Sequence, residues 1–268
     1  MEKKFKLGVI GGGYMAYSII SGAIKGGTLD CADVFVCDLS QESLEKFNKL
    51  NVKTTFNSKE LADLSEFVLF AVKPQNSAQV FENIQGCNCN KFISIMAGVK
   101  KETIKNSLGN CLVARCMPNA PCAVGNGAVG IDLSDFENEK DKKFVSSVFS
   151  SISTLVELPE DKMNAVTGVS GSSPAYFYLF AKMLIESGVE HGLTQEQAFD
   201  LVVNTMVGSG KILLNNKDKS IDELIDSVCS KGGTTIQAIN LFKEQDLEGI
   251  TKKAVDSCIK RAFELESL

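Results

Sequence analysis

A short buried strand that leads through three glycines into an apolar helix constrains the fold of this chain more than any other feature. The strand is Leu7–Ile10, the turn is Gly11-Gly12-Gly13, and the helical stretch runs from Tyr17 to Ile24. The first and third glycines, with Ala16, match the G-x-G-x-x-A pattern, which combines a tight turn, close approach to a pyrophosphate and close helix-on-strand packing. The segment therefore predicts a dinucleotide-binding unit in preference to a purely structural glycine turn.

A second strand, Val34–Cys37, supports this interpretation because it ends at Asp38, near where an acid is expected to meet the adenosine ribose. Asp38 can accept hydrogen bonds from both ribose hydroxyls and would repel a 2′-phosphate, and Leu39-Ser40-Gln41 contains no arginine to bind one. The sequence therefore favours NADH over NADPH. NADPH stays an alternative, because Ser40 could accept the phosphate if Asp38 points away from the pocket.

Strands alternate with helices up to residue 160, and no strand is predicted after it. The further strands are expected at Phe67–Val72, Phe92–Met96, Cys111–Cys116, Ala128–Ile131 and Thr154–Glu157. Such alternation predicts a mainly parallel sheet with helices on both faces. The expected fold is an α/β Rossmann-like doubly wound sheet over 1–160, which binds the dinucleotide, followed by an all-helical domain over 161–268.

Helix signals dominate the second half. Pro174 can occupy the first turn of a long apolar helix through Leu184. Two capping boxes are expected to begin later helices: Thr194 with Gln197, and Ser220 with Glu223. The segment Tyr176–Ile185 is apolar around most of its circumference, so it needs cover on several sides. We expect a partner subunit to supply that cover, and Gly208 and Gly210 inside the next helix to face a closely packed backbone.

Composition excludes several classes of function. The chain has 268 residues, 44% hydrophobic content and a net charge of −5, so it offers no basic face for nucleic acid. No apolar run has the length needed to cross a bilayer, and Met1–Lys4 leads into a strand without the apolar core and cleavage site of a signal peptide. We therefore expect a cytoplasmic protein whose nine cysteines are reduced.

The cysteines and the lone histidine are interpreted as structural. Cys87 and Cys89 are too closely spaced for the usual zinc pairs, and no metal site is expected. His191 stands beside Gly192 at a predicted helix end, which favours a structural role over catalysis. Five other cysteines are expected to be small buried apolar residues: Cys31, Cys37, Cys111, Cys116 and Cys122.

A glycine turn between two helical patterns near the end of the chain predicts a site for a small anion. The turn is Ser230-Lys231-Gly232-Gly233-Thr234-Thr235. Paired glycines let the backbone approach a ligand, and the first amides of the following helix point outward with the positive end of the helix dipole behind them. Three hydroxyls in the turn add donors that can orient a carboxylate and a neighbouring polar atom. The alternative is an ordinary helix N-cap with a flexible entry.

With both sites identified, the chain resembles the pyrroline-5-carboxylate reductases over essentially its whole length. Five ordered segments carry the resemblance: Gly11-Gly12-Gly13-Tyr14-Met15-Ala16, Ala71-Val72-Lys73-Pro74-Gln75, Arg115-Cys116-Met117-Pro118-Asn119, Ser170-Gly171-Ser172-Ser173-Pro174-Ala175-Tyr176 and Ser230-Lys231-Gly232-Gly233-Thr234-Thr235. The resemblance implies reduction of 1-pyrroline-5-carboxylate to L-proline by hydride transfer from NADPH or NADH, the final step of proline biosynthesis. It also implies a homodimer made by the helical domain, which in this family can build a larger ring such as a decamer.

Carried over position by position, the resemblance implies two groups of site residues. The cofactor residues, with Asp38 added from the argument above, are Gly11, Gly12, Gly13, Tyr14, Met15, Asp38, Asn57, Ala71, Val72, Lys73, Pro74, Met96, Ala97 and Gly98. The substrate-binding residues are Ser230, Gly232, Gly233, Thr234 and Thr235. Pro118 and Asn119 are expected to form part of the wall between the two ligands, although Asn119 could equally fix its own loop.

The chemistry asks for orientation more than for acid-base groups. A protonated imine is already electrophilic, so the protein mainly has to hold the imine carbon at near-attack distance from the cofactor and exclude water. The hydroxyl of Thr235 is the catalytic candidate, as a hydrogen-bonding partner of the ring nitrogen. Its alternative role is that of an ordinary threonine at a helix start.

Three departures from the family pattern keep other functions open. Lys231 stands where the family normally has proline, Ser173 replaces a common glycine, and Asn215–Asp218 lacks a clear match to an acidic residue often found there. One alternative is a reductase of the 3-hydroxy-acid or imine type, with Lys182 or Lys211 as its catalytic lysine. Another is a dinucleotide-sensing protein that has lost activity.

Overall fold

The structure, a computed structural model, describes residues 5–266, so Met1–Lys4, which bears on the signal-peptide prediction, lies outside the described residues. The chain divides into two compact units. The first comprises the residues up to Pro174 together with those from Ser257 onward, and the second comprises Ala175–Asp256. The division of labour predicted from the sequence, with its boundary after residue 160, stays a prediction.

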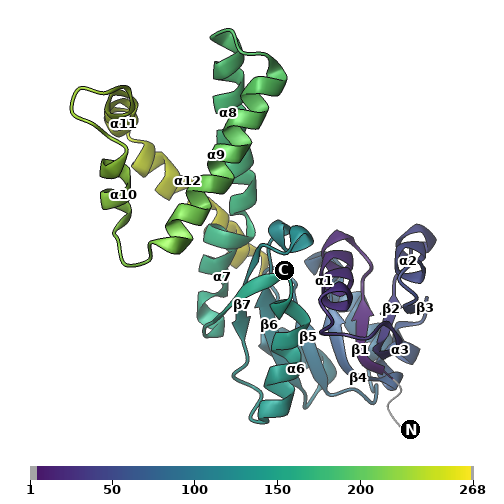
Figure 1. Ribbon diagram of the computed structural model, residues 1–268. Coiled ribbons are helices and arrows are strands. Elements are labelled where there is room, and N and C mark those ends of the chain that lie inside the picture. The colour runs from purple at the N-terminus through teal and green to yellow at the C-terminus, as the bar shows by residue number, and fades with distance from the viewer. Residues whose placement is uncertain (1–4, 267–268) are drawn as a thin grey trace. The chain divides into compact units, whose positions relative to one another are not determined.

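Within residues 5–266, eight strands of the first unit form one sheet, in the order β3-β2-β1-β4-β5-β6-β7-β8 (Figure 1). The strands are β1 Phe5–Ile10, β2 Val34–Cys37, β3 Lys53–Thr55, β4 Ser65–Phe70, β5 Lys91–Ser94, β6 Leu112–Met117, β7 Gly127–Asp132 and β8 Ser153–Glu157. Neighbouring strands run parallel, except that β7 is antiparallel to β6. The predicted, mainly parallel Rossmann-like sheet is confirmed.

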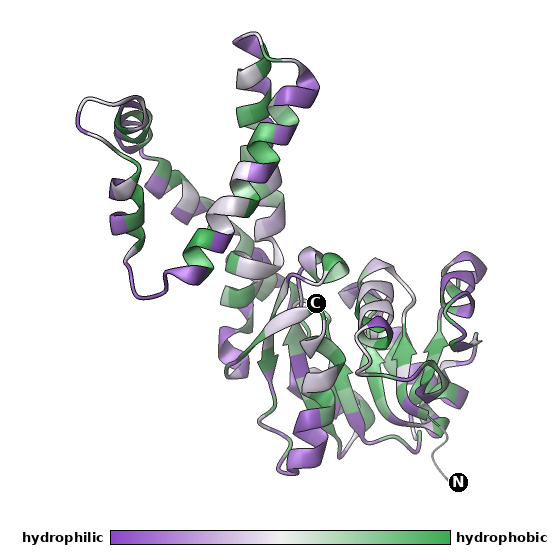
Figure 2. Cartoon of the chain, viewed as in Figure 1, coloured by the Kyte–Doolittle hydropathy of each residue, from purple (hydrophilic) through white to green (hydrophobic). Residues whose placement is uncertain are grey.

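Both faces of the sheet are buried because side chains alternate along the central strands. In β4, Phe67 and Leu69 join one apolar cluster, whereas Val68 and Phe70 join the cluster on the opposite face. The strands accordingly form the apolar centre of this unit in Figure 2. Each fully buried side chain of this size contributes about 1.5–3 kcal/mol to folding, so the sheet is a rigid platform for the loops at its edges.

Helices cover the two faces separately. The helices of this unit are α1 Tyr14–Lys25, α2 Gln41–Asn48, α3 Ser58–Leu64, α4 Ser77–Ile84, α5 Lys101–Leu108, α6 Glu139–Ser150 and α7 Met163–Val166. Buried apolar residues of α1, α2 and α6 belong to one cluster and those of α3, α4 and α5 to the other. Short helical turns complete the unit: η1 Cys31–Asp33, η2 Pro74–Asn76, η3 Ala120–Val124, η4 Glu160–Lys162 and the π-helical η5 Thr167–Gly171.

Two of the strands that differ from the sequence-based expectation do so for a local reason. The edge strand β3 was not predicted, because Lys53-Thr54-Thr55 is three residues long and only partly buried, so it shows no apolar period. The strand predicted at Phe67–Val72 begins earlier, at Ser65, and ends at Phe70. Its last two predicted residues instead enter the loop that leads to Pro74.

The second unit is helical, as predicted. Its helices, with α8 beginning and α12 ending in the first unit, are α8 Ser173–Glu190, α9 Gln195–Asn215, α10 Ile221–Ser227, α11 Thr234–Glu244 and α12 Leu247–Leu265. Both predicted capping boxes are present, since the Thr194 and Ser220 hydroxyls accept hydrogen bonds from the amides of Gln197 and Glu223, whose side chains bond back. Among the described residues, no helix is both long and apolar enough to cross a membrane.

Apolar surface of the second unit is largely uncovered within one chain. Of the apolar residues in Ala175–Asp256, all of which the structure describes, three are buried: Ala181, Ile185 and Ala198. Large apolar side chains are exposed instead along α8 and α9, which Figure 2 shows as apolar turns. A Cβ added at Gly208 or Gly210 would meet no other described part of the chain within 4 Å. The close neighbour expected for these glycines is therefore not found among residues 5–266 of one chain.

The predicted structural cysteines are confirmed, with one exception. Cys37, Cys111, Cys116 and Cys122 are buried, whereas Cys31 is only half-buried because it lies in the η1 turn. Burial raises the pKa of the Cys37 and Cys111 thiols to about 11 and raises the pKa of the Cys116 thiol further. These side chains are therefore neutral and unreactive at physiological pH.

Candidate active site

The glycine turn between β1 and α1 is shaped by its first glycine and left open at its third. Gly11 has a φ of +101°, and a Cβ there would lie 2.7 Å from the carbonyl oxygen of Ala71. Gly13 is the N-cap of α1, has a φ of −67°, and would carry a Cβ that meets no other described part of the chain within 4 Å. Packing therefore requires glycine at 11 but not at 13. The close approach of a pyrophosphate at residue 13 stays a prediction. Tyr14 and Met15 follow in the first turn of α1, whose amides suit an anion.

Asp38 joins the end of β2 to this turn. Its Oδ2 accepts a hydrogen bond from the Gly12 amide at 2.5 Å, and its Oδ1 accepts one from the Ser40 amide at 2.7 Å. Each carboxylate oxygen keeps a further lone pair, so the group can also accept from ribose hydroxyls. The sequence pointed to Asp38 as a cofactor contact, but it did not show that the carboxylate also fixes the glycine turn.

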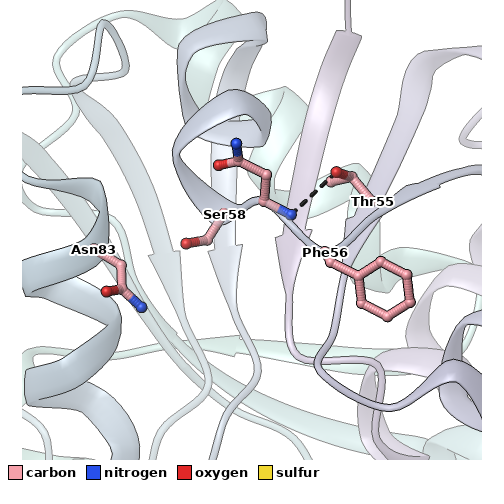
Figure 3. A pocket seen from close by; sticks show the side chains of 5 residues that line it. Thr55, Phe56, Ser58 and Asn83 are labelled. Atoms are coloured by element: carbon pink, nitrogen blue, oxygen red, sulfur yellow. Dashed lines mark hydrogen bonds between the residues drawn. The ribbon is translucent and has the colours of Figure 1, made fainter.

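Asn57 lies in the loop after β3, beside an open pocket of about 490 Å³ lined by Thr55, Phe56, Asn57, Ser58 and Asn83 (Figure 3). Its side chain caps α3 by accepting a hydrogen bond from the Glu60 amide at 3.0 Å, and its amide donates to Thr55 Oγ1 at 3.1 Å. The ring of Phe56 is more than half exposed. Residue 57 thus organises the loop, and the exposed ring is a feature that the sequence did not single out.

Two further strand ends bring the remaining cofactor candidates to the same edge of the sheet. The Ala71 amide donates to the Ile10 carbonyl at 2.8 Å, and the Ile95 amide donates to the Phe70 carbonyl at 3.1 Å. The segments Ala71–Pro74 and Met96–Gly98 therefore follow β4 and β5 beside the glycine turn. Carboxyl ends of parallel strands at the point where the strand order reverses are where such sheets hold ligands. The predicted cofactor residues thus follow the carboxyl ends of the parallel strands β1 to β5, along one edge of the sheet.

The predicted substrate turn, in the second unit, is built as the N-terminus of α11. Gly233 is the N-cap of α11, which has neither a capping side chain nor an acidic residue in its first turn. Gly232 has a φ of +74°, which favours glycine, and a Cβ on Gly233 would collide with Ser230 Oγ. The Ser230 hydroxyl thus lies against the helix start, and Thr234 and Thr235 are exposed in the first turn. Such a helix start suits a small anion, and the substrate site at this turn stays a prediction.

Asn119 fixes its own loop, the second of the two roles considered for it. Its Oδ1 accepts a hydrogen bond from the Ala128 amide at 3.0 Å, and its Nδ2 donates to the Ser170 carbonyl at 3.4 Å. Ser170 belongs to the π-helical turn Thr167–Gly171, a distortion often found at functional sites. Asn119 thereby connects the loop after β6 with the family motif that precedes α8.

A buried cluster of charges at the start of α5 was not predicted from the sequence. Lys101 Nζ contacts Asp132 Oδ1 at 3.1 Å and Asp135 Oδ1 at 3.0 Å. Burial alone would lower the pKa of Lys101, but hydrogen bonds to the two carboxylates outweigh it and raise that pKa, and both aspartates have a lowered pKa despite burial. The partners are 31 and 34 residues from the lysine, so no local pattern could reveal them.

The lysines of the alternative reductase and the lone histidine lie at exposed positions. Lys182 is exposed and lies 3.6 Å from Glu186 on the same helix, and Lys211 is exposed. His191 follows the end of α8 and its Nδ1 lies 2.8 Å from the Ser187 carbonyl oxygen, as expected of a helix-end residue. In the part of the chain that the structure describes, no cluster of three or more metal-ligating side chains is found.

Comparisons with known proteins assign both halves of the chain. A family model described as pyrroline-5-carboxylate reductase dimerisation matches residues 160–265, and one described as NADP oxidoreductase, coenzyme F420-dependent, matches residues 6–98. The pyrroline-5-carboxylate reductase of Haemophilus influenzae is 33% identical over 263 residues, which cover 97% of each chain. The chain belongs to the pyrroline-5-carboxylate reductase family. The enzyme of the same name from Staphylococcus saprophyticus is 30% identical over 267 residues, with 98% of each chain covered.

Solved structures agree with this assignment. The pyrroline carboxylate reductase of Plasmodium falciparum, with NADP bound, is 27% identical and superimposes with a TM-score of 0.89 over 99% of this chain and 100% of that one. The pyrroline-5-carboxylate reductase of Coxiella burnetii is 31% identical, with a TM-score of 0.87 over 98% and 99% of the two chains. The chain is thus an NAD(P)H-dependent oxidoreductase that reduces 1-pyrroline-5-carboxylate to L-proline.

Proposed function

We propose that this chain reduces 1-pyrroline-5-carboxylate with the cofactor bound at the edge of the sheet that carries the Gly11–Gly13 turn. The substrate carboxylate binds at the N-terminus of α11. The observation that carries this assignment is the start of α11, which has a glycine N-cap, no capping side chain and no acid in its first turn. Helix starts are usually capped by a side chain, so an uncapped start beside a serine hydroxyl suits an external anion. In this division, 1–160 binds the cofactor and 161–268 binds the substrate and dimerises.

The residues at the glycine edge fit a dinucleotide. Gly13 leaves room for a pyrophosphate where a Cβ would meet no described neighbour, and the amides of the first turn of α1 point to the same place. The adenosine ribose would lie by Asp38 and Asn57, and the nicotinamide end by Ala71–Pro74 and Met96–Gly98. When bound, the cofactor supplies the hydride. The chain holds the ring in place and excludes water from it.

The substrate turn orients the other reactant. The Ser230 hydroxyl and the amides of Gly233 and Thr234 would bind the carboxylate, and the left-handed Gly232 brings the backbone close to it. The Thr235 hydroxyl would bond the ring nitrogen as it changes from imine to amine. A hydrogen bond to a charged group contributes about 1.5–3 kcal/mol, which is enough to select one orientation of the ring.

NADH is the proposed preferred cofactor. A 2′-phosphate would meet the Asp38 carboxylate, whose two oxygens are held in place by backbone amides. The Ser40 hydroxyl, the alternative phosphate ligand, already caps α2 by accepting a hydrogen bond from the Ser43 amide at 3.3 Å. These contacts favour two free ribose hydroxyls over a phosphate at this position.

The enzyme is proposed to act as a homodimer in the cytoplasm, and the proposal extends to a ring of dimers such as a decamer. Self-association rests on the matched dimerisation model and on the exposed apolar side chains of α8 and α9. A cytoplasmic location suits the neutral thiols of Cys37, Cys111 and Cys116, which are kept reduced there.

The test follows oxidation of NADH and of NADPH by the purified protein with 1-pyrroline-5-carboxylate. Thr235→Ala is expected to lower kcat/KM by roughly 10- to 100-fold, the loss of one charge-assisted hydrogen bond, and Thr235→Ser to restore most of it. Lys182→Ala and Lys211→Ala serve as controls and should retain full activity. Full activity in Thr235→Ala, or its loss in either lysine variant, would overturn the residue assignment. A lower KM for NADPH than for NADH would refute the cofactor preference.

A further inference from the structure

The end of α12 packs against the turn between β5 and α5. Gly98 in that turn has a φ of +71°, and a Cβ there would lie 2.7 Å from Leu265 Cβ and 3.3 Å from the Ala262 carbonyl oxygen. Leu265 and Glu266 also line a cavity of about 200 Å³ together with Gly98. The last turn of α12 therefore lies directly on a turn assigned to the cofactor.

Glu266 ties this contact to three other elements. Its carboxylate is almost fully buried, and Oε2 lies 3.1 Å from Lys100 Nζ. Oε1 accepts a hydrogen bond from Asn164 Nδ2 at 3.0 Å and lies 3.4 Å from Arg115 Nη2. One carboxylate thus joins the start of α5, the strand β6, the helix α7 and the end of α12.

Arg115 makes this arrangement sensitive to the charge of Glu266. The Arg115 side chain is 1% exposed and lies between two carboxylates, with Nη1 3.2 Å from Glu160 Oε1 and Nη2 on Glu266. Glu160 Oε1 also accepts a hydrogen bond from the Lys101 amide at 2.7 Å, at the beginning of α5. A buried guanidinium that loses one of its carboxylates is strongly destabilised in its position, so neutralising Glu266 should shift both Arg115 and the start of α5.

Lys100 and Arg115, two partners of the Glu266 carboxylate, lie close in sequence to proposed ligand contacts. Lys100 follows Met96–Gly98 by two residues, and Arg115 pairs in register with Ser94 and precedes Pro118 and Asn119 in the same strand and loop. We propose that Glu266 is a positioning residue, which fixes the β5–α5 turn and the β6 end so that the nicotinamide ring is held in one orientation. This inference rests on the proposed cofactor site, whose residues it takes as given.

The test compares Glu266→Gln with a matched control, Glu264→Gln. Glu264 lies on the same helix, but its carboxylate is exposed and pairs with Arg261 at 2.8 Å. A glutamine at 266 keeps the size of the side chain and removes its charge. Lys100→Gln provides a second variant that removes one partner from a half-exposed position, where folding is less at risk.

Three measurements separate positioning from general stability. Fluorescence titration with NADH, without substrate, gives the cofactor Kd; steady-state kinetics gives kcat and both KM values; hydrogen exchange reports opening of residues 96–100. A misplacement of about 1 Å can cost roughly 100-fold in rate. Glu266→Gln is therefore expected to lower kcat by at least tenfold, to raise the cofactor Kd and to speed exchange at 96–100, with the KM for the imine nearly unchanged. Lys100→Gln should show a smaller change of the same kind.

The outcomes distinguish this inference from the proposed function. If Glu266→Gln is folded and matches Glu264→Gln in Kd, kcat and exchange, the positioning role is refuted while turnover by the unmodified enzyme keeps the function. If Glu266→Gln does not fold, an unchanged Lys100→Gln refutes the role and a raised Kd with lowered kcat supports it. If the unmodified enzyme binds NADH but does not reduce the imine, the proposed function fails, and the titration and exchange data still decide the role of Glu266.

Discussion

Alanine at the first and at the third glycine of the β1–α1 turn should separate stability from cofactor binding. In Gly11→Ala the new Cβ lies 2.7 Å from a backbone oxygen at a φ of +101°. The left-handed backbone costs about 1–2 kcal/mol and the overpacking about 1–3 kcal/mol. The sum, about 2–5 kcal/mol, corresponds to a fall in Tm of roughly 4–10 °C for a chain of this size.

Gly13→Ala should behave in the opposite way. Its φ of −67° suits alanine and its Cβ meets no described neighbour within 4 Å, so the lost N-cap preference and the reduced chain entropy nearly cancel, within about 0.5 kcal/mol. The same Cβ would occupy the proposed closest approach of the pyrophosphate, so the Kd for NADH should rise at least tenfold, about 1.4 kcal/mol.

Thermal unfolding and fluorescence titration of both variants check this pair. An unchanged Kd for NADH in Gly13→Ala would refute the argument that a Cβ at residue 13 obstructs the cofactor. An unchanged Tm in Gly11→Ala would refute the argument that a Cβ at residue 11 destabilises the fold.

Two further perturbations test other parts of the molecule. Lys101→Met leaves Asp132 and Asp135 short of their buried partner, so urea unfolding at pH 7 should show a loss of about 3–5 kcal/mol. Folding lowers the pKa of each aspartate, so their stabilisation is present above the unfolded pKa of about 3.9 and is lost as pH falls through the folded pKa. If the destabilisation caused by Lys101→Met does not shrink below about pH 4, the assignment is contradicted. Phe199→Asp changes a side chain that is 52% exposed in one chain and should weaken dimerisation by about 2 kcal/mol or more; sedimentation showing an intact dimer would argue against α9 as interface.

Most of the sheet could be predicted from the sequence because its strands carry their own signals. Buried apolar runs ending in glycine or an acid, such as Leu7–Ile10 and Val34–Cys37, mark both the strand and the point where it ends. β3 carries no such signal, since its three residues owe their extended shape to pairing with β2. The antiparallel direction of β7 could not be predicted either, because the mostly apolar pattern of its six residues is compatible with either strand direction.

The candidate site shows the same limit. The glycines and the acid at strand ends are local features, and the structure brings the predicted cofactor residues to one edge. The second role of Asp38, as acceptor for the Gly12 amide 26 positions away, depends on the fold. So does the carboxylate of Glu266, whose partner Arg115 is 151 residues distant. Contacts of this kind leave no periodic trace in one sequence.

The sparse interior of Ala175–Asp256, with its three buried apolar residues, makes the stability of this enzyme a matter of mass action. The apolar side chains of this segment are mostly exposed to solvent in one chain, and burying them against a second copy stabilises the fold. The midpoint of unfolding should therefore rise with protein concentration. At low protein concentration, a protease should cleave the helical segment Ala175–Asp256 before the rest of the chain. The amount of enzyme in a cell would then fall more steeply than its rate of synthesis.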